Sequence, residues 1–352
     1  MSFYGVMQLG VPQLKGLLRR AGGVERRRYL LALLARDGLC VAFAAAFLSA
    51  LNALFGAENS CAGVVCFCLL LGCRFVHFNY RLRDTAAGLA AAFALLTLGP
   101  PLAHLGPPLF RLAVNLACMG ALLLLTADQP RMGNGLLYLF SYLLLYGSPA
   151  EGAVLALRCG EMAVGFALCA GVVWLRHRHS LPDRGLRDVV RALSLGEARC
   201  RWQLRTALGV SLAVFLGELL GLPRVMWVGF AASSVLSAYG APPRARAAGR
   251  VTGALAGCAL FVLVYTLCPA SLRGGLGILS GLCLGLCASY RGTTAFNCLG
   301  ALLTAAPLYG PGGAMVLRLC SNLLGALFGA LFALGWERLL PVGGAAPEAA
   351  EG

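Results

Sequence analysis

Twelve apolar runs fill most of this 352-residue sequence, and short polar segments separate them. A helix needs roughly 20 apolar residues to cross a hydrocarbon core about 30 Å thick. Only 12% of the residues are charged, against about 25% in soluble domains. The sequence therefore predicts an all-α polytopic membrane protein with about twelve transmembrane helices. The runs cover residues 38–56, 60–78, 85–103, 108–126, 133–148, 152–175, 205–222, 225–240, 248–268, 272–289, 293–309 and 313–336.

The placement of basic residues predicts the topology, because cytoplasmic loops of membrane proteins collect Lys and Arg. With the N-terminus inside, nearly all basic residues of this chain fall on the inner side. We therefore expect both termini in the cytoplasm, an even number of helices and a location in the bacterial plasma (inner) membrane. The arginines left on the outer side or at outer helix ends are Arg111, Arg158, Arg224, Arg273 and Arg318.

Several classes of protein are disfavoured by the same pattern. A net charge of +15 would suggest a nucleic-acid partner in a soluble protein, but here the arginines lie in short gaps between apolar runs. The fifteen cysteines are scattered through those runs without zinc spacing. There is no catalytic motif and no loop long enough for a catalytic domain. We expect no enzyme activity, no metal and no cofactor; the expected partner is the lipid bilayer.

The second half of the chain repeats features of the first. Arg83 corresponds to Arg250 at the start of the third helix of each half. Arg158 corresponds to Arg318 in the last helix of each half. The offset is about 160–167 residues in each case, which predicts two six-helix repeats inserted in the same orientation, as parallel repeats are in some transporters.

This repeat predicts the domain organisation. We expect a basic cytoplasmic leader at 1–35, the first membrane repeat at 36–176, a charged cytoplasmic linker at 177–204, the second repeat at 205–340 and a cytoplasmic tail at 341–352. Within the leader, residues 11–34 are compatible with a basic helix lying at the membrane interface or with a plain cytoplasmic segment.

Small residues recur every fourth position in several runs. Gly249, Gly253 and Gly257 are the clearest set, and Ala86, Ala90 and Ala94 take the matching place in the first repeat. This spacing places small side chains on one helix face and lets neighbouring helices approach closely in lipid. The pattern predicts tight helix packing and is compatible with a homo-oligomer.

Polar side chains inside spanning helices carry a functional hypothesis by default, because they are expensive in lipid. Glu161 lies about ten residues into an apolar run, one turn after Arg158. It could carry a coupling proton, or it could form an ion pair or hydrogen bond with Arg158. The matching residue of the second repeat is Ser321, so the carboxyl group is not duplicated.

Three further positions have two interpretations each. Glu218 is a second candidate for proton coupling, or it faces the outer interface. Asn322 lines a pathway or forms an interhelical hydrogen bond. Trp227 is a candidate pore residue, although an aromatic belt at the membrane surface is the default explanation for a tryptophan beside an apolar run.

The segment from Arg205 to Gly257 resembles the fusaric acid resistance (FUSC) or aromatic acid exporter superfamily. That family has a short first helix opening with Arg, a Trp starting the second helix, then Pro and spaced arginines leading into a Gly-rich third helix. The resemblance is clear over 205–340 and extends to 36–178 only through the repeat. The residues that carry it are Arg205, Trp227, Pro242 or Pro243, Arg246, Arg250, Thr252, Gly253 and Gly257.

The resemblance implies efflux of aromatic carboxylate anions driven by the proton-motive force. We expect Arg83 and Arg250 to supply positive charge at the inner mouth and Arg158 and Arg318 to do so in the outer half, with Glu161 in proton coupling. Arginine suits carboxylates because its planar fork binds both oxygens. A passive anion channel and a membrane scaffold, with residues 177–201 as docking surface, are the alternatives.

Overall fold

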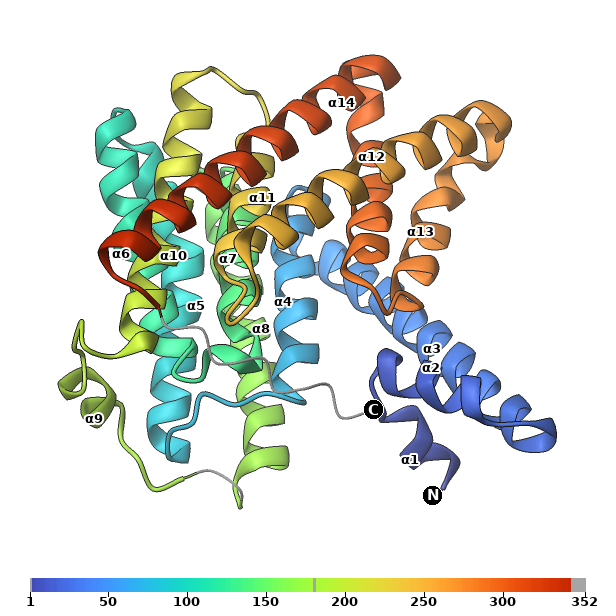
Figure 1. The fold of residues 1–352 in the computed structure, drawn as a ribbon, viewed down its shortest axis with the longest axis horizontal. Coiled ribbons are helices and arrows are strands. Elements are labelled where there is room, and N and C mark those ends of the chain that lie inside the picture. Colours follow the sequence, from blue (N-terminus) through green and yellow to red (C-terminus); the bar gives the residue numbers. More distant parts are fainter. Residues whose placement is uncertain (1, 180–181, 343–352) are drawn as a thin grey trace. The chain divides into compact units, whose positions relative to one another are not determined.

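The computed structural model describes residues 2–179 and 182–342, and the described residues form helices and loops without a β-strand (Figure 1). The predicted tail therefore lies mostly outside the described residues. The α-helices are α1 (Phe3–Met7), α2 (Val11–Arg20), α3 (Gly23–Phe55), α4 (Ser60–Cys73), α5 (Leu82–His104), α6 (Pro108–Thr126), α7 (Asn134–Tyr146), α8 (Gly152–His177), α9 (Leu186–Arg191), α10 (Ala198–Leu219), α11 (Met226–Leu236), α12 (Pro243–Leu267), α13 (Leu276–Gly285) and α14 (Tyr290–Leu339).

Each of the twelve apolar runs contains a helical segment. Six of the helices, namely α3, α5, α6, α8, α12 and α14, are long and apolar enough to cross a membrane. The helices α4, α7 and α11 are apolar but shorter. The chain is therefore a multi-pass helical membrane protein, whereas the number of twelve spans stays a prediction.

Helix α14 accounts for two of the predicted runs. Its backbone leaves the helical region at Gly310, where φ is 71°, a left-handed value that glycine adopts without steric strain. Pro307 and Pro311 flank this point, and proline lacks the N–H that continues a helix. The break divides α14 into one segment before Gly310 and one after it, as the runs 293–309 and 313–336 predict.

The chain divides into two compact units, and each unit combines two segments that are separate in the sequence. Unit 1 contains Met1–Ala46 and Ala248–Asn322, and unit 2 contains Phe47–Ala247 and Leu323–Gly352. Helices α3, α12 and α14 each contribute to both units. The predicted domains follow the sequence repeat instead, and this division into two repeats stays a prediction.

The N-terminal helices of unit 1 pack on the beginning of α3. Leu14 of α2 is fully buried and belongs to a small core with Val6, Ala32 and Leu33. Arg36 donates a hydrogen bond to the Leu9 carbonyl at 3.0 Å. The apolar face of α2 is thus covered by protein.

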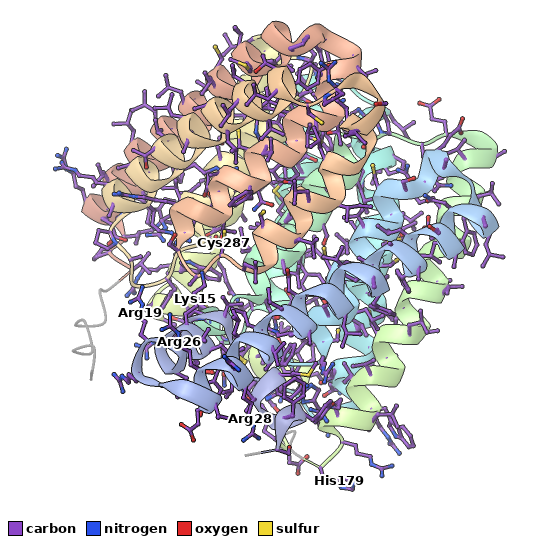
Figure 2. All side chains as sticks on the ribbon, turned by 90° about the vertical axis from the view of Figure 1, so that its right-hand side faces the viewer. Lys15, Arg19, Arg26, Arg28, His179 and Cys287 are labelled. Atoms are coloured by element: carbon purple, nitrogen blue, oxygen red, sulfur yellow. The ribbon has the colours of Figure 1, made fainter. Side chains whose placement is uncertain are left out.

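The predicted interfacial helix over 11–34 is wrong in its extent. The helix stops at Arg20 and a new one begins at Gly23, whose φ is 52°. Because α3 then runs without interruption to Phe55, the leader is not separate from the first long apolar helix. Figure 2 labels four basic residues of α2 and the first turns of α3: Lys15, Arg19, Arg26 and Arg28.

The charged linker is held to the ends of helices in unit 2. Asp128, after α6, accepts hydrogen bonds from Arg184 at 3.0 Å, from Asn79 at 2.9 Å and from Arg199. Asp84, in the first turn of α5, accepts from the Leu186 N–H at 2.9 Å. These contacts order the linker, including α9, against its own unit.

Three glycines of α12 lie against the first part of α14. A Cβ atom on Gly253 would stand 2.8 Å from the Arg291 carbonyl oxygen, and one on Gly257 would stand 2.4 Å from that of Ala295. On Gly249 a Cβ would meet the Tyr290 ring at 3.0 Å. A larger side chain would therefore push the two helices apart, and their separation positions the polar residues described next.

Candidate functional site

Two buried arginines and one asparagine form a polar cluster in unit 1. The Arg250 Nε–H on α12 donates to Asn322 Oδ1 on α14 at 2.9 Å. The Asn322 amide in turn donates to the Arg318 carbonyl, one turn earlier, at 2.8 Å. Exposed fractions are 8% for Arg250, 4% for Arg318 and 1% for Asn322. We call these three residues the arginine cluster.

The electrostatics of the arginine cluster favour an anion. Arg250 and Arg318 repel each other, and burial removes the water that would otherwise screen both charges. A carboxylate placed between two guanidinium groups would relieve this repulsion and accept charge-assisted hydrogen bonds. Among the residues singled out from the sequence, the structure brings these three together on neighbouring helices.

Arg158 in unit 2 is engaged by the protein itself. Its Nε–H donates to Asn59 Oδ1 at 3.0 Å and its Nη1–H donates to the Ser148 carbonyl at 2.7 Å. Asn59 also donates to the carbonyls of Phe55 and Val154, at 3.1 and 3.2 Å. These bonds join the start of α8 to the turn between α3 and α4, which gives Arg158 a structural use in this arrangement.

Glu161 is fully buried on α8. Neither of its carboxyl oxygens has a hydrogen-bond partner among the described residues. A Cβ atom on Gly63 of α4 would lie 3.1 Å from Oε1, so the carboxyl group faces that helix. The ion pair or hydrogen bond with Arg158 is absent within the described part of the chain, because the guanidinium points to Asn59 and Ser148 instead.

Glu218 lies near the end of α10, and its side chain is 10% exposed. The Tyr146 hydroxyl donates to Oε1, and the Arg111 Nη1 lies 3.6 Å from the same oxygen. The His104 ring stacks on the Tyr146 ring with centroids 4.6 Å apart. The sequence singled out Glu218 and placed Arg111 on the outer side, but it did not predict that Arg111 and Tyr146 contact Glu218. The only signal for these partners was a polar group at the end of another apolar run.

Trp227 is buried and does not form part of a lipid-facing belt. Its exposed fraction is 2%, and the Arg224 guanidinium lies 5.7 Å from its ring centroid. The default interpretation as a belt residue is therefore wrong. Tryptophans at helix ends face lipid only when packing leaves that side of the helix open, and here unit 2 covers it.

Arg83 and Arg250 have different environments although the repeat matches them. Arg83 is the second residue of α5 and is exposed, whereas Arg250 is the eighth residue of α12 and is buried. Arg250 thus lies six residues further from the start of its helix than Arg83 does. The structure therefore does not place Arg83 in a cluster like that of Arg250.

Arg205 has an acidic partner that sequence reasoning did not name. Its Nη1 lies 2.7 Å from Glu337 Oε1, and its Nη2 donates to the Leu236 carbonyl at 3.0 Å. Arg205 and Glu337 are 132 residues apart in the sequence, so their ion pair becomes visible only when α10 packs on α14. The arginine that opens α10 therefore has a clear structural use.

The fold and these residues define a helical membrane protein with buried guanidinium and carboxyl groups in its apolar helices. Residues 212–332 match the model of the family described as fusaric acid resistance protein-like. The matched segment is about a third of the chain and contains the whole arginine cluster, Trp227 and Glu218. The resemblance predicted from the sequence is confirmed over these residues. Comparison with curated proteins and with solved structures gives no match.

Proposed function

We propose that this protein is a secondary transporter that exports organic carboxylate anions, aromatic ones in particular, with the proton-motive force as driving force. The observation that carries the proposal is the arginine cluster of Arg250, Arg318 and Asn322, buried within apolar helices of the family-matched segment. Charged groups in such helices are expensive and mark ion and substrate sites. The aromatic preference comes from the family resemblance.

The arginine cluster supplies recognition of the carboxylate. Each guanidinium presents parallel N–H donors that fit two carboxylate oxygens. Asn322 fixes the Arg250 side chain by accepting the hydrogen bond of its Nε–H at 2.9 Å. Binding of one anion to two cations leaves the cluster with less net charge, which lowers the free energy of placing it in an apolar surrounding.

Glu161 supplies the proton site. An ionised carboxylate buried without hydrogen-bond donors is far more expensive than the neutral acid, so its protonation state and its burial are linked. A conformational change that exposes the Glu161 side chain to water would release the proton. Return of the side chain to its buried position would require the carboxyl group to bind a proton again. Glu218 is the second candidate, with its phenolic partner Tyr146 and its cationic neighbour Arg111.

The remaining elements of the proposal follow the sequence analysis. They are twelve spanning helices in two parallel repeats, both termini in the cytoplasm of a bacterium, and no enzymatic reaction. The charge distribution and the helical segment within every apolar run support this arrangement. No cofactor has a part in it, since the driving force is an ion gradient.

The test is uptake of radiolabelled benzoate by proteoliposomes under an imposed pH gradient. We expect accumulation that collapses when a protonophore is added, and loss of the gradient effect in Glu161→Gln. Empty liposomes control for diffusion of the neutral acid. A protein without benzoate flux in either direction would contradict the proposal. Unitary currents in a planar bilayer that ignore the pH gradient would show a passive channel instead.

A further inference from the structure

Two cysteine side chains meet inside unit 1. Cys258 on α12 and Cys298 on α14 have their sulfur atoms 3.8 Å apart, and the side chains are 4% and 1% exposed. The Cys298 thiol also approaches the Ala254 carbonyl, at 3.5 Å. This pair of thiols takes no part in the function proposed above.

The backbone holds the two thiols close together. A Cβ atom on Gly257, the residue before Cys258, would stand 2.6 Å from the Cys298 Cβ and 2.4 Å from the Ala295 carbonyl oxygen. The two helices α12 and α14 can approach each other this closely because Gly257 has no side chain. Neither cysteine needs a helix movement to reach the other, so a ligand that binds both sulfurs finds them already placed.

A positive charge lies beside the pair. The Arg318 guanidinium donates a hydrogen bond to the Cys298 side chain, and Arg250 also acts on Cys298 electrostatically. A cation beside the pair would offset the negative charge of a complex formed by two thiolates and one monovalent metal ion. The thiol pair therefore has the charge environment that a bis-thiolate complex needs.

We propose that Cys258 and Cys298 form a two-coordinate site for a soft monovalent metal ion, Cu(I) or Ag(I). Binding breaks two S–H bonds, forms two metal–sulfur bonds and releases two protons to solvent. No oxidation state changes. The product, two thiolates and one monovalent ion, carries a single negative charge, and the Arg318 guanidinium faces it with a single positive charge.

The number of ligands and their softness select the ion. Zn²⁺ takes four ligands in structural sites, and among the described residues there is no group of three or more Cys, His, Asp or Glu side chains that could hold a metal. Thiolates are soft ligands that select Cu(I) as well as zinc, and the small number of ligands here leaves the monovalent ion. With metal–sulfur bonds of about 2.3 Å, sulfurs up to about 4.6 Å apart can share one ion. Small rotations of the two side chains from 3.8 Å reach that span.

A second buried thiol pair in unit 2 provides a matched control. Cys73 on α4 and Cys169 on α8 are hydrogen-bonded to each other, and their neighbours include Tyr138 and Cys66 rather than an arginine. The two pairs share burial and sulfur chemistry. They differ in the guanidinium group beside the sulfur atoms, so a comparison of Ag(I) binding by the two pairs tests the effect of that positive charge.

The experiment measures Ag(I) binding to the purified full-length protein in detergent. Equilibrium dialysis against a monothiol competitor, followed by silver analysis of the protein, gives the affinity and the number of tightly bound ions. We expect one tight ion in the wild type and in Cys73→Ser/Cys169→Ser. Cys258→Ser and Cys298→Ser should each weaken it at least about 100-fold, because loss of either sulfur removes the whole chelate effect. Equal tight binding in the two single variants and the wild type would overturn the proposal.

Arg318→Gln tests the same site with both sulfurs in place. We expect its affinity for the tight Ag(I) ion to fall about tenfold, since the complex loses its counter-charge. An unchanged affinity would refute the role of Arg318. Size-exclusion profiles and thermal unfolding of every variant separate loss of the site from loss of the fold. If a serine variant fails to fold, the alanine variant at that position takes its place.

Discussion

Arg158 and Arg318 correspond to each other in the predicted repeat, yet their surroundings differ in kind. In unit 2, Arg158 donates to an asparagine side chain and a backbone carbonyl, and a buried carboxyl group lies one turn further along its helix. In unit 1, Arg318 lies with a second arginine and a thiol. The arginine of unit 2 is thus a structural link, whereas the arginine of unit 1 is part of a cationic cluster.

The difference shows that two arginines at corresponding positions of the predicted repeat can have unlike chemical surroundings. In the same predicted alignment Glu161 corresponds to Ser321, and both are fully buried. The carboxyl group is therefore absent at the matching position of the unit that holds the two arginines. We infer that proton binding and anion binding are divided between the two units, and the following substitutions test that division.

The largest expected effect comes from Arg318→Gln compared with Arg158→Gln. A hydrogen bond to a charged group contributes about 1.5–3 kcal/mol, so loss of one from a bound carboxylate should reduce benzoate transport about 10- to 100-fold. Arg158→Gln should instead mainly lower the unfolding temperature, because Asn59 and Ser148 lose their donor. Proteoliposome flux and thermal unfolding in detergent measure both. Equal loss of flux in a well-folded Arg158→Gln would break the comparison.

The next effect concerns Glu161→Gln. The glutamine amide places two N–H donors at a fully buried site where the described residues form no hydrogen bond with the carboxyl oxygens, so the free energy of unfolding should fall by about 1–3 kcal/mol. Transport should continue down a benzoate gradient but no longer respond to a pH gradient. The control is Ser321→Ala, which should leave the pH response intact. A Gln variant that still accumulates benzoate against its gradient would remove Glu161 from coupling.

A moderate effect is expected from alanine at the packing glycines of each unit. Gly257→Ala in unit 1 meets a backbone carbonyl oxygen at 2.4 Å and should destabilise by about 1–3 kcal/mol. Gly165→Ala in unit 2 meets the Cys66 sulfur at 2.2 Å, a side-chain atom that can rotate away, and should be milder. Gly277→Ala has no atom within 4 Å and should stabilise slightly. Thermal unfolding should rank the variants in this order.

The smallest effect should follow Arg83→Gln, set beside its repeat partner Arg250→Gln. Arg83 is exposed, and surface substitutions usually change the free energy of unfolding by no more than about 0.5 kcal/mol. Benzoate flux should stay at the wild-type level, whereas Arg250→Gln should lower it. A comparable loss of flux in both variants would contradict this expectation. It would support the prediction from the repeat that Arg83 and Arg250 both supply positive charge at the inner mouth.

The helices could be predicted well because their signal is local. Each apolar run must satisfy its backbone hydrogen bonds within one segment when it enters lipid, so length and composition identify it. The break at Gly310 between two prolines is local in the same sense. Side-chain partners were much less predictable. Glu161 lies one turn from Arg158 in the sequence, yet the arginine bonds to Asn59, which is 99 residues away.

The sequence by itself determined a helical membrane protein, its apolar segments and a resemblance over residues 212–332 to the fusaric acid resistance family, since hydropathy and glycine spacing act along single helices. Only the tertiary structure decided which arginines are buried, that Trp227 faces protein, and that Cys258 meets Cys298. The physical reason is that these properties depend on where helices begin and on which faces they present to one another. Arg83 and Arg250 correspond to each other in the predicted repeat, yet packing leaves Arg83 exposed and buries Arg250.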